Sequence, residues 1–273
     1  MVAMNLTSLN SELRRRAPRL HSTLKGWLGR WMQSDTPWLP ILRRVHRRWL
    51  WVHPSLLTAS VGTEEEFVTE WVNAHLPRHG VLFDVGAHWG VVSLLAARRA
   101  SRVVAFEPSP YLGRILRYHC RANRAFNIEI SDRVVTHETT ERIGFYLLND
   151  GNSYRNSLTI GSDATPFVDP RDRKLVELPA VSIDDYCDEN ALTPDLIKVD
   201  VEGAEQWVLE GAQKTLERHR PVLIVSLHEY WMPPGHNETT VLAILGSWGY
   251  RIADERFASG SGVRVRDILA VPA

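Results

Sequence analysis

The sequence predicts an α/β fold in which helices cover both faces of a mostly parallel sheet. Apolar runs of strand length alternate with runs of helical periodicity from residue 62 to residue 248. Several strand-like runs also end in a carboxylate or a glycine turn, as strands do when they lead to a ligand site. The chain has 273 residues and is 44% apolar, which is enough for one large domain preceded by an arm.

The predicted elements follow in chain order. A helix begins near Thr63, with Glu66 three positions later as in a capping box. The predicted strands are 81–85, 102–106, 127–135, 195–200 and 221–227, and the predicted helices are 89–100, 110–124, 203–218 and 238–248. Two short strands, 142–148 and 174–181, flank a polar loop at 149–173 that we expect to be mobile and close to the substrate. The tail predicts an edge hairpin from 250–255 and 263–271.

The first 60 residues differ from the rest in charge. They hold ten Lys or Arg against two acidic residues, a balance of +8 in a chain of net charge zero. Segments 20–32 and 38–50 place Trp and Leu at helical spacing, with arginines on the opposite side of the second one. We therefore predict a basic, Trp-rich amphipathic helical arm at 1–60 and a second domain at 61–273. We favour an arm that packs on that domain or on a second subunit. The alternative is an arm that lies on an anionic membrane surface.

Composition limits the cellular location and the binding partners that we expect for the protein. The zero net charge gives no reason to expect a nucleic-acid partner. Cys120 and Cys187 lack metal-type spacing and predict reduced thiols in a cytoplasmic protein, with peripheral membrane contact through the arm left open. We expect no signal peptide, and no run approaches the ~20 apolar residues of a membrane-spanning helix.

The stretch VLFDVGAHWG at 81–90 carries the first ligand signal. A buried strand leads into a glycine turn, where Gly86 and Gly90 would let a ligand approach the backbone. Their spacing is not that of dinucleotide-binding turns, and Asp84 would repel phosphate but suits a cationic ammonium or sulfonium group. Both features disfavour a nicotinamide oxidoreductase. Glu107 ends the next strand, where a carboxylate can bind both hydroxyls of a ribose; the alternative is a solvated strand-end carboxylate.

Four stretches together resemble the FkbM family of S-adenosylmethionine-dependent methyltransferases: DVGAHWG, FEPSP, LIKVDVEGAEQWVLEGA and RPVLIVSLHEY. The resemblance covers roughly residues 65–271. It implies a seven-stranded class I methyltransferase sheet, Rossmann-like, with the last strand antiparallel, and methyl transfer usually to a hydroxyl. Carried over position by position, it implies Asp84, Gly86 and Gly90 on the methionine side of the cofactor and Glu107 on its ribose. We also expect Ala87, His88, Pro108 and Asp200 at the cofactor site, and His88 has the alternatives of touching the acceptor or simply packing. The family usually has Asn at position 88 and often Glu at position 226, where this chain has His and Ser, which bears on the identity of the acceptor.

The candidate catalytic residues follow the fourth and fifth predicted strands. Lys198, Asp200 and Glu202 alternate along one strand end and so point the same way. His228 is the best base by residue type, Asp200 is the second choice or orients the base, and Lys198 would neutralise the carboxylates. Glu202 and Glu205 have a simpler alternative role as favourable charges at a helix N-terminus.

A divalent cation is a further possibility for the acidic residues. Asp184, Asp185, Asp200, Glu202 and His228 offer ligands that a hard cation accepts. We predict no metal, because proximity in the sequence does not show that side chains converge in space.

The sequence therefore predicts an S-adenosylmethionine-dependent O-methyltransferase that acts on a hydroxyl of a small molecule, sugar or glycolipid. The alternatives are an N-methyltransferase of the same fold and a non-catalytic membrane-surface binding protein whose arm is the working part. The acceptor and the oligomeric state, including a homodimer, stay open.

Overall fold

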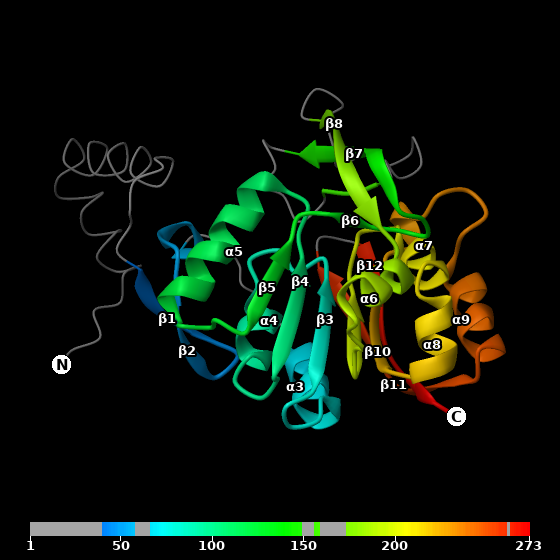
Figure 1. Ribbon diagram of the computed structural model, residues 1–273, viewed down its shortest axis with the longest axis horizontal. Helices are drawn as coiled ribbons and strands as arrows, with labels where there is room; N and C mark the ends of the chain where they lie inside the picture. Colours follow the sequence, from blue (N-terminus) through cyan, green and yellow to red (C-terminus); the bar gives the residue numbers. More distant parts are fainter. Residues whose placement is uncertain (1–39, 58–65, 149–155, 159–172, 261–262) are drawn as a thin grey trace.

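The computed structural model describes residues 40–57, 66–148, 156–158, 173–260 and 263–273 (Figure 1). The helix predicted at 20–32, the cap at Thr63 and most of the predicted loop at 149–173 lie outside these ranges.

A central seven-stranded sheet organises the chain, in the order β11-β12-β10-β9-β3-β4-β5. Its strands are β3 (Val81–Val85), β4 (Arg102–Phe106), β5 (Ile128–Ser131), β9 (Leu196–Val199), β10 (Val222–Leu227), β11 (Tyr250–Gly260) and β12 (Val263–Pro272). All neighbours from β10 to β5 pair in parallel, whereas β12 is antiparallel to both β10 and β11. The predicted sheet, its antiparallel last strand and its edge hairpin are confirmed.

Helices cover both faces of this sheet, as the alternation predicted (Figure 1). One face packs against α3 (Glu66–His75), α4 (Val91–Ala96) and α5 (Pro110–Ala122). The other packs against α6 (Ile183–Asn190), α7 (Glu205–Glu210), α8 (Gln213–His219) and α9 (Glu238–Ser247). Strand side chains alternate between these layers: Leu82 contacts the first core and Phe83 the second. Parallel strands buried on both faces explain the continuous apolar runs in the sequence.

Two predicted elements are divided. The strand predicted at 127–135 becomes β5 and the two-residue β6 (Val134–Val135). The helix predicted at 203–218 breaks between α7 and α8 at Gly211, where a Cβ would lie 2.2 Å from the Thr136 carbonyl oxygen. The backbone at Gly211 packs so closely against the backbone of Thr136 that there is no space for a side chain at the break.

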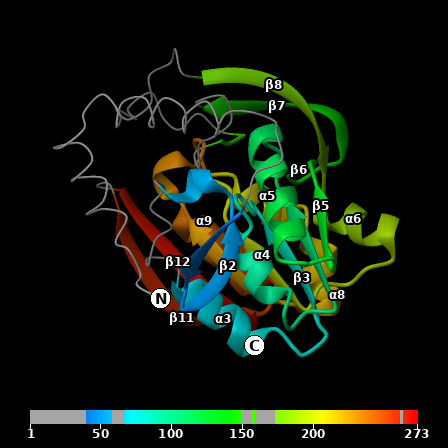
Figure 2. The same cartoon turned by 90° about the vertical axis from the view of Figure 1, so that its left-hand side faces the viewer.

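The helix predicted at 38–50 is wrong. Residues 41–52 form an antiparallel hairpin of β1 (Ile41–Val45) and β2 (Arg48–Val52), followed by a short 3-10 helix (Pro54–Leu57). The turn of the hairpin consists of His46 and Arg47, whose φ values of 43° and 62° are left-handed. Such a turn is usually marked by glycine or asparagine in the sequence, and this one has neither. The inner side chains Val45, Leu50 and Val52 are buried against α4 and α5. Figure 2 faces this side of the molecule.

A small sheet lies beyond the carboxyl ends of the central strands, at the top of Figures 1 and 2. It has the order β6-β8-β7, with the predicted strands β7 (Thr140–Leu148) and β8 (Arg173–Val181) pairing antiparallel. Ser157 bridges to Tyr146 of β7 and donates a hydrogen bond of 2.7 Å to the Glu202 carbonyl oxygen. The small sheet is thereby attached to the turn that follows β9.

The remaining composition-based predictions concern thiols and membrane spans. Cys120 and Cys187 are both free and buried, and burial raises the pKa of each thiol to about 11. None of the helices that the structure describes has the length and apolar character needed to cross a bilayer.

Candidate active site

The turn after β3 is built from three left-handed residues. Gly86, His88 and Gly90 have φ of 77°, 53° and 78°. The amides of Gly86 and Ala87 both donate to the Phe106 carbonyl oxygen, which ties this turn to the end of β4. His88 occupies a conformation that Asn adopts more readily than most residues, so the departure from the family pattern falls on a strained position.

The two glycines are required for a reason that the sequence does not reveal. A Cβ on Gly86 would lie 1.9 Å from the Asp200 carbonyl oxygen, and one on Gly90 would lie 2.0 Å from Leu116 Cδ1. Their missing side chains make room for neighbouring protein atoms, whereas the sequence pattern predicts that they make room for a ligand.

Gly86→Ala is therefore expected to destabilise the fold by about 2–4 kcal/mol, because it adds a backbone clash to a left-handed φ. Thermal or urea unfolding measures the change. Gly246→Ala is the matched control: a Cβ added to Gly246 in α9 would meet no neighbouring atom within 4 Å, so alanine should leave stability unchanged or raise it slightly. Equal melting temperatures for the two variants would contradict the packing argument.

Asp84 lies beneath the turn and is fully buried. Ser93 donates a 2.6 Å hydrogen bond to its Oδ2, and Lys198 Nζ lies 3.3 Å from its Oδ1. Lys198 also donates to the Gly86 carbonyl oxygen at 2.9 Å and lies 3.3 Å from Asp200 Oδ2. Lys198 thus lies between Asp200 and Asp84, whereas the sequence predicts that it neutralises Asp200 and Glu202. Asp84 supports the turn from below.

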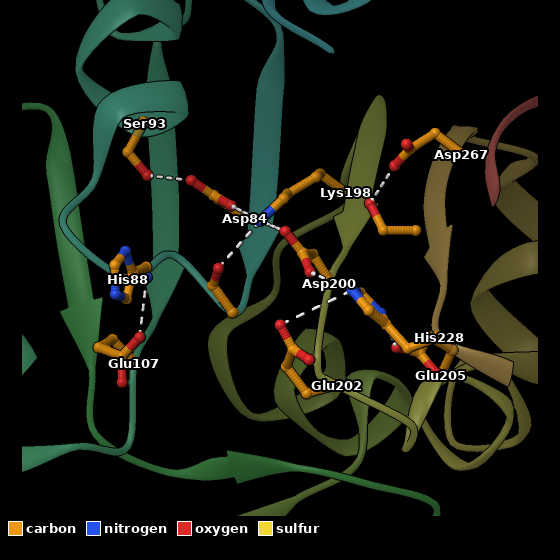
Figure 3. A network of polar contacts seen from close by, with 12 residues as sticks. Asp84, His88, Ser93, Glu107, Lys198, Asp200, Glu202, Glu205, His228 and Asp267 are labelled. Atoms are coloured by element: carbon orange, nitrogen blue, oxygen red, sulfur yellow. Dashed lines mark hydrogen bonds and ion pairs between the residues drawn. The ribbon is translucent and has the colours of Figure 1, made fainter. Parts of the chain in front are cut away.

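Glu107 is held at the tip of β4 by backbone amides. His88 donates to Oε2 at 2.8 Å and Ser109 donates to Oε1 at 2.9 Å (Figure 3). The residue is only 5% exposed, and burial raises the pKa of its carboxyl group to about 7 against the opposing effect of the two amides and Lys198. Each oxygen keeps a further lone pair, so the carboxylate can accept hydrogen bonds from two vicinal hydroxyls.

Unsatisfied polar atoms surround the same turn. His88 Nε2 and Trp89 Nε1 are buried and have no hydrogen-bond partner among the described residues. Burial lowers the pKa of His88 to about 4, so its ring is neutral and can either donate or accept. Because buried polar groups rarely stay unsatisfied, these atoms fit a polar ligand beside Glu107.

Three of the predicted catalytic side chains converge (Figure 3). His228 Nε2 lies 3.7 Å from both Asp200 Oδ1 and Glu202 Oε1. The side chain of His228 is 8% exposed, and those of Asp200 and Glu202 are 27% and 13% exposed. The end of β9 and the end of β10 bring them together, as expected of neighbouring parallel strands.

Glu205 fixes the orientation of His228. It is fully buried at the start of α7, and its Oε1 accepts from His228 Nδ1 at 2.8 Å and from the Gly203 amide at 3.0 Å. From the sequence alone, this residue is equally well a group that positions the acceptor or a favourable charge at a helix N-terminus. Its contact with His228 spans 23 residues and has no local sequence signal.

The carboxylates change the titration of the cluster. Burial acts to lower the pKa of His228, but Glu202, Glu205 and Asp200 outweigh it and raise that pKa well above its ordinary value. Burial acts to raise the pKa of Asp200, but Lys198 and His228 outweigh it and lower that pKa. The carboxylates therefore favour the imidazolium form of His228.

The five residues considered for a cation do not all meet. Asp184 accepts hydrogen bonds from Lys214 and Thr215 at the start of α8, and Asp185 accepts from Thr139. Asp200, Glu202 and His228 do offer ligand atoms within 4.8 Å of one another, so three of the five residues converge.

Position 226, where the family often has Glu, is Ser in this chain. Ser226 donates a hydrogen bond to Asp267, its cross-strand partner on β12. Burial raises the pKa of Asp267 to about 6. A neighbouring strand thus supplies a carboxyl group here, which could not be read from the sequence around Ser226.

A model of the methyltransferase FkbM domain matches residues 84–252. The structure is similar to a candidate SAM-dependent methyltransferase from Streptococcus mutans, with TM-score 0.51 and 11% identity over 87% of this chain and 56% of that one. It is also similar to the methyltransferase FkbM of Methylobacillus flagellatus KT, with TM-score 0.47 and 20% identity over 71% of this chain and 44% of that one. It is similar as well to TYW2 of M. jannaschii in complex with AdoMet, with TM-score 0.46 and 12% identity over 88% of this chain and 90% of that one.

No curated protein matches the chain. The chain spans less than half the length of the Methylobacillus protein, and at these identities the structural likeness concerns the fold. The matched segment 84–252 covers more than half of the chain and contains the turn after β3, Glu107 and the cluster around His228. The chain therefore belongs to the FkbM family of methyltransferases, whose methyl donor is S-adenosylmethionine.

Proposed function

We propose that this chain is an O-methyltransferase that transfers the methyl group of S-adenosylmethionine to a hydroxyl of a small molecule, sugar or glycolipid. The observation that carries the proposal is the convergence of Asp200, Glu202 and His228 at the same edge of the sheet as Glu107 (Figure 3). A hydroxyl acceptor must be oriented and must lose a proton, and this cluster provides groups for both tasks.

The residues divide into two groups in this proposal. Glu107 would hold the ribose hydroxyls of the cofactor, and the turn around His88 would line the pocket. The cofactor supplies a methyl group activated by a sulfonium ion. Lys198 and Asp84 would keep the turn and Asp200 in place beneath it.

The raised pKa of His228 changes the role that residue type suggested for it. The carboxylates favour the protonated form of His228, and an imidazolium ion cannot accept a further proton. The proton acceptor in this proposal is therefore one of the two facing carboxylates, Glu202 or Asp200. Asp200 lies between two cations, which makes its carboxylate the weaker base. We therefore favour Glu202 as the acceptor of the hydroxyl proton, with the His228 imidazolium orienting the hydroxyl.

A matched pair of acceptors tests the choice of oxygen over nitrogen. The protein is incubated with S-adenosylmethionine that carries a deuterated methyl group, and with sugars that differ only in a hydroxyl or an amine at one carbon. Tandem mass spectrometry locates the label. We expect label on oxygen in both sugars; label confined to the amine would support the N-methyltransferase instead.

A glycolipid fraction from cells provides a second acceptor set. Label recovered in that fraction would assign the lipid-linked class within the proposed function. Label found only in small-molecule acceptors would leave the O-methyltransferase in place and remove the glycolipid.

A further inference from the structure

The outer face of the β1–β2 hairpin exposes large apolar side chains beside arginine. The strand register pairs Leu42 with Trp51 and Arg44 with Trp49, and these four side chains share one face because alternate residues point the same way. Leu42, Trp49 and Trp51 are 49%, 58% and 43% exposed, and Arg44 is exposed as well. Two exposed Trp on one short hairpin are unusual for a surface that meets only water.

The charge on this hairpin has one sign. Residues 36–63 contain no Asp or Glu. Arg43 turns inward and donates to the Leu56 carbonyl oxygen, and Arg47 pairs with Glu66 of α3 at 2.9 Å. Arg44 and Arg48 are exposed, and within the described ranges no carboxylate pairs with either. Arg44 shares the outer face with Trp49 and Trp51, whereas Arg48 pairs with Val45 at the turn end of the inner face. The Arg44 guanidinium group is thus available on the outer face for an external anion.

The neighbouring helix α5 is basic as well. Residues 108–128 also contain no acidic residue. The exposed residues of α5 and the turn after it include an arginine row at three- and four-residue spacing, which places them along one side of the helix. They are Arg114, Arg117, Arg121 and Arg124.

The hairpin is fastened to the domain, so the exposure of its outer face is built into the fold. Asn123, which follows α5, accepts from the Trp51 amide at 2.9 Å and donates to its carbonyl oxygen at 2.7 Å. Arg98 donates to the Trp49 carbonyl oxygen at 3.3 Å. With Val45, Leu50 and Val52 buried on the inner face, the hairpin cannot turn its Trp inward without leaving the core.

We propose that the outer face of this hairpin docks on an anionic phospholipid bilayer. Arginine binds lipid phosphates bidentately, and Trp settles at the boundary between headgroups and acyl chains. Leu42 favours a bilayer over single-stranded nucleic acid, because an aliphatic side chain cannot stack on a base but can enter the acyl region. This docking does not depend on the proposed reaction.

Vesicle binding tests the proposal with the full-length protein. Co-sedimentation is measured with phosphatidylcholine vesicles, with and without phosphatidylserine, at low and high salt. We expect binding only with phosphatidylserine, and weaker binding at high salt, because salt screens surface charges. The double variant Trp49→Ala with Trp51→Ala should lower the partition coefficient at least tenfold, and the single variant Arg44→Gln should lower it about fivefold.

Two controls make the result specific to the hairpin. Leu175→Ala with Arg78→Gln removes an exposed apolar and an exposed basic side chain elsewhere and should bind as the wild type does. Melting temperatures confirm that all variants are folded. Unchanged vesicle binding in both hairpin variants would overturn the proposal, and so would tight binding to a single-stranded RNA without binding to vesicles.

Discussion

Glu107→Gln is expected to lower the affinity for S-adenosylmethionine about 10- to 150-fold, the effect of losing one hydrogen bond to a charged group. The Glu107 carboxylate accepts two backbone amides and keeps lone pairs for two ribose hydroxyls, whereas an amide presents only one accepting oxygen. Isothermal titration calorimetry with the full-length protein measures the change directly.

Glu177→Gln is the matched control, because Glu177 is exposed on β8, where it pairs with Arg142 at 3.3 Å. A pH series gives a second signature in the wild type. With the pKa of Glu107 at about 7, the group loses its proton as pH rises through neutrality, so affinity should be about tenfold higher at pH 8 than at pH 6. The glutamine variant should lose this dependence. Wild-type affinity in Glu107→Gln would remove the ribose assignment.

His228→Gln is expected to lower turnover by about 100-fold or more and to leave cofactor affinity nearly unchanged, because a misplacement of the acceptor by about 1 Å can cost about 100-fold in rate. Glutamine keeps a donor but removes the positive charge that faces Asp200 and Glu202. Two like charges would then lie together in a half-buried site without their counter-ion, so the acceptor hydroxyl loses its orientation. Single-turnover rates with saturating cofactor measure the effect.

The matched control is His219→Gln, which changes an exposed histidine at the end of α8. Glu205→Gln separates orientation from charge, because it weakens the hydrogen bond to Nδ1 and leaves the imidazole in the site. We expect an intermediate rate for that variant. Full turnover in His228→Gln would exclude the residue from the reaction. Its hydrogen bond with Glu205 would then have a structural role only.

The parts of the fold that follow from local pattern were predictable. Apolar runs bounded by polar residues located β3, β4, β9 and β10, and parallel pairing then placed Asp200 and His228 at one edge. The hairpin was not predictable in this way. Leu42, Val45 and Trp49 satisfy helical spacing, while the strand alternation is masked because Arg43 turns inward to bind a carbonyl oxygen.

The residues of the candidate site were predictable, but the contacts between them were not. The sequence identified Asp84 and Lys198, yet their mutual distance of 3.3 Å depends on neighbouring strands that are far apart in the chain. The same holds for Glu205 on His228 and for Asp267 beside Ser226. A pKa is set by such contacts, so the protonated state of His228 could not be anticipated from residue type.

The inner face of the hairpin has a consequence for the smallest portion of the chain that can fold autonomously. Val45, Leu50, Val52 and Leu56 complete a core shared with α4 and α5, although the family match begins only at residue 84. A recombinant fragment trimmed to the matched segment would present that apolar surface to solvent and invite aggregation. Dissecting the N-terminal region therefore calls for point substitutions on the outer face of an intact chain, since truncation would confound loss of a binding surface with loss of the scaffold.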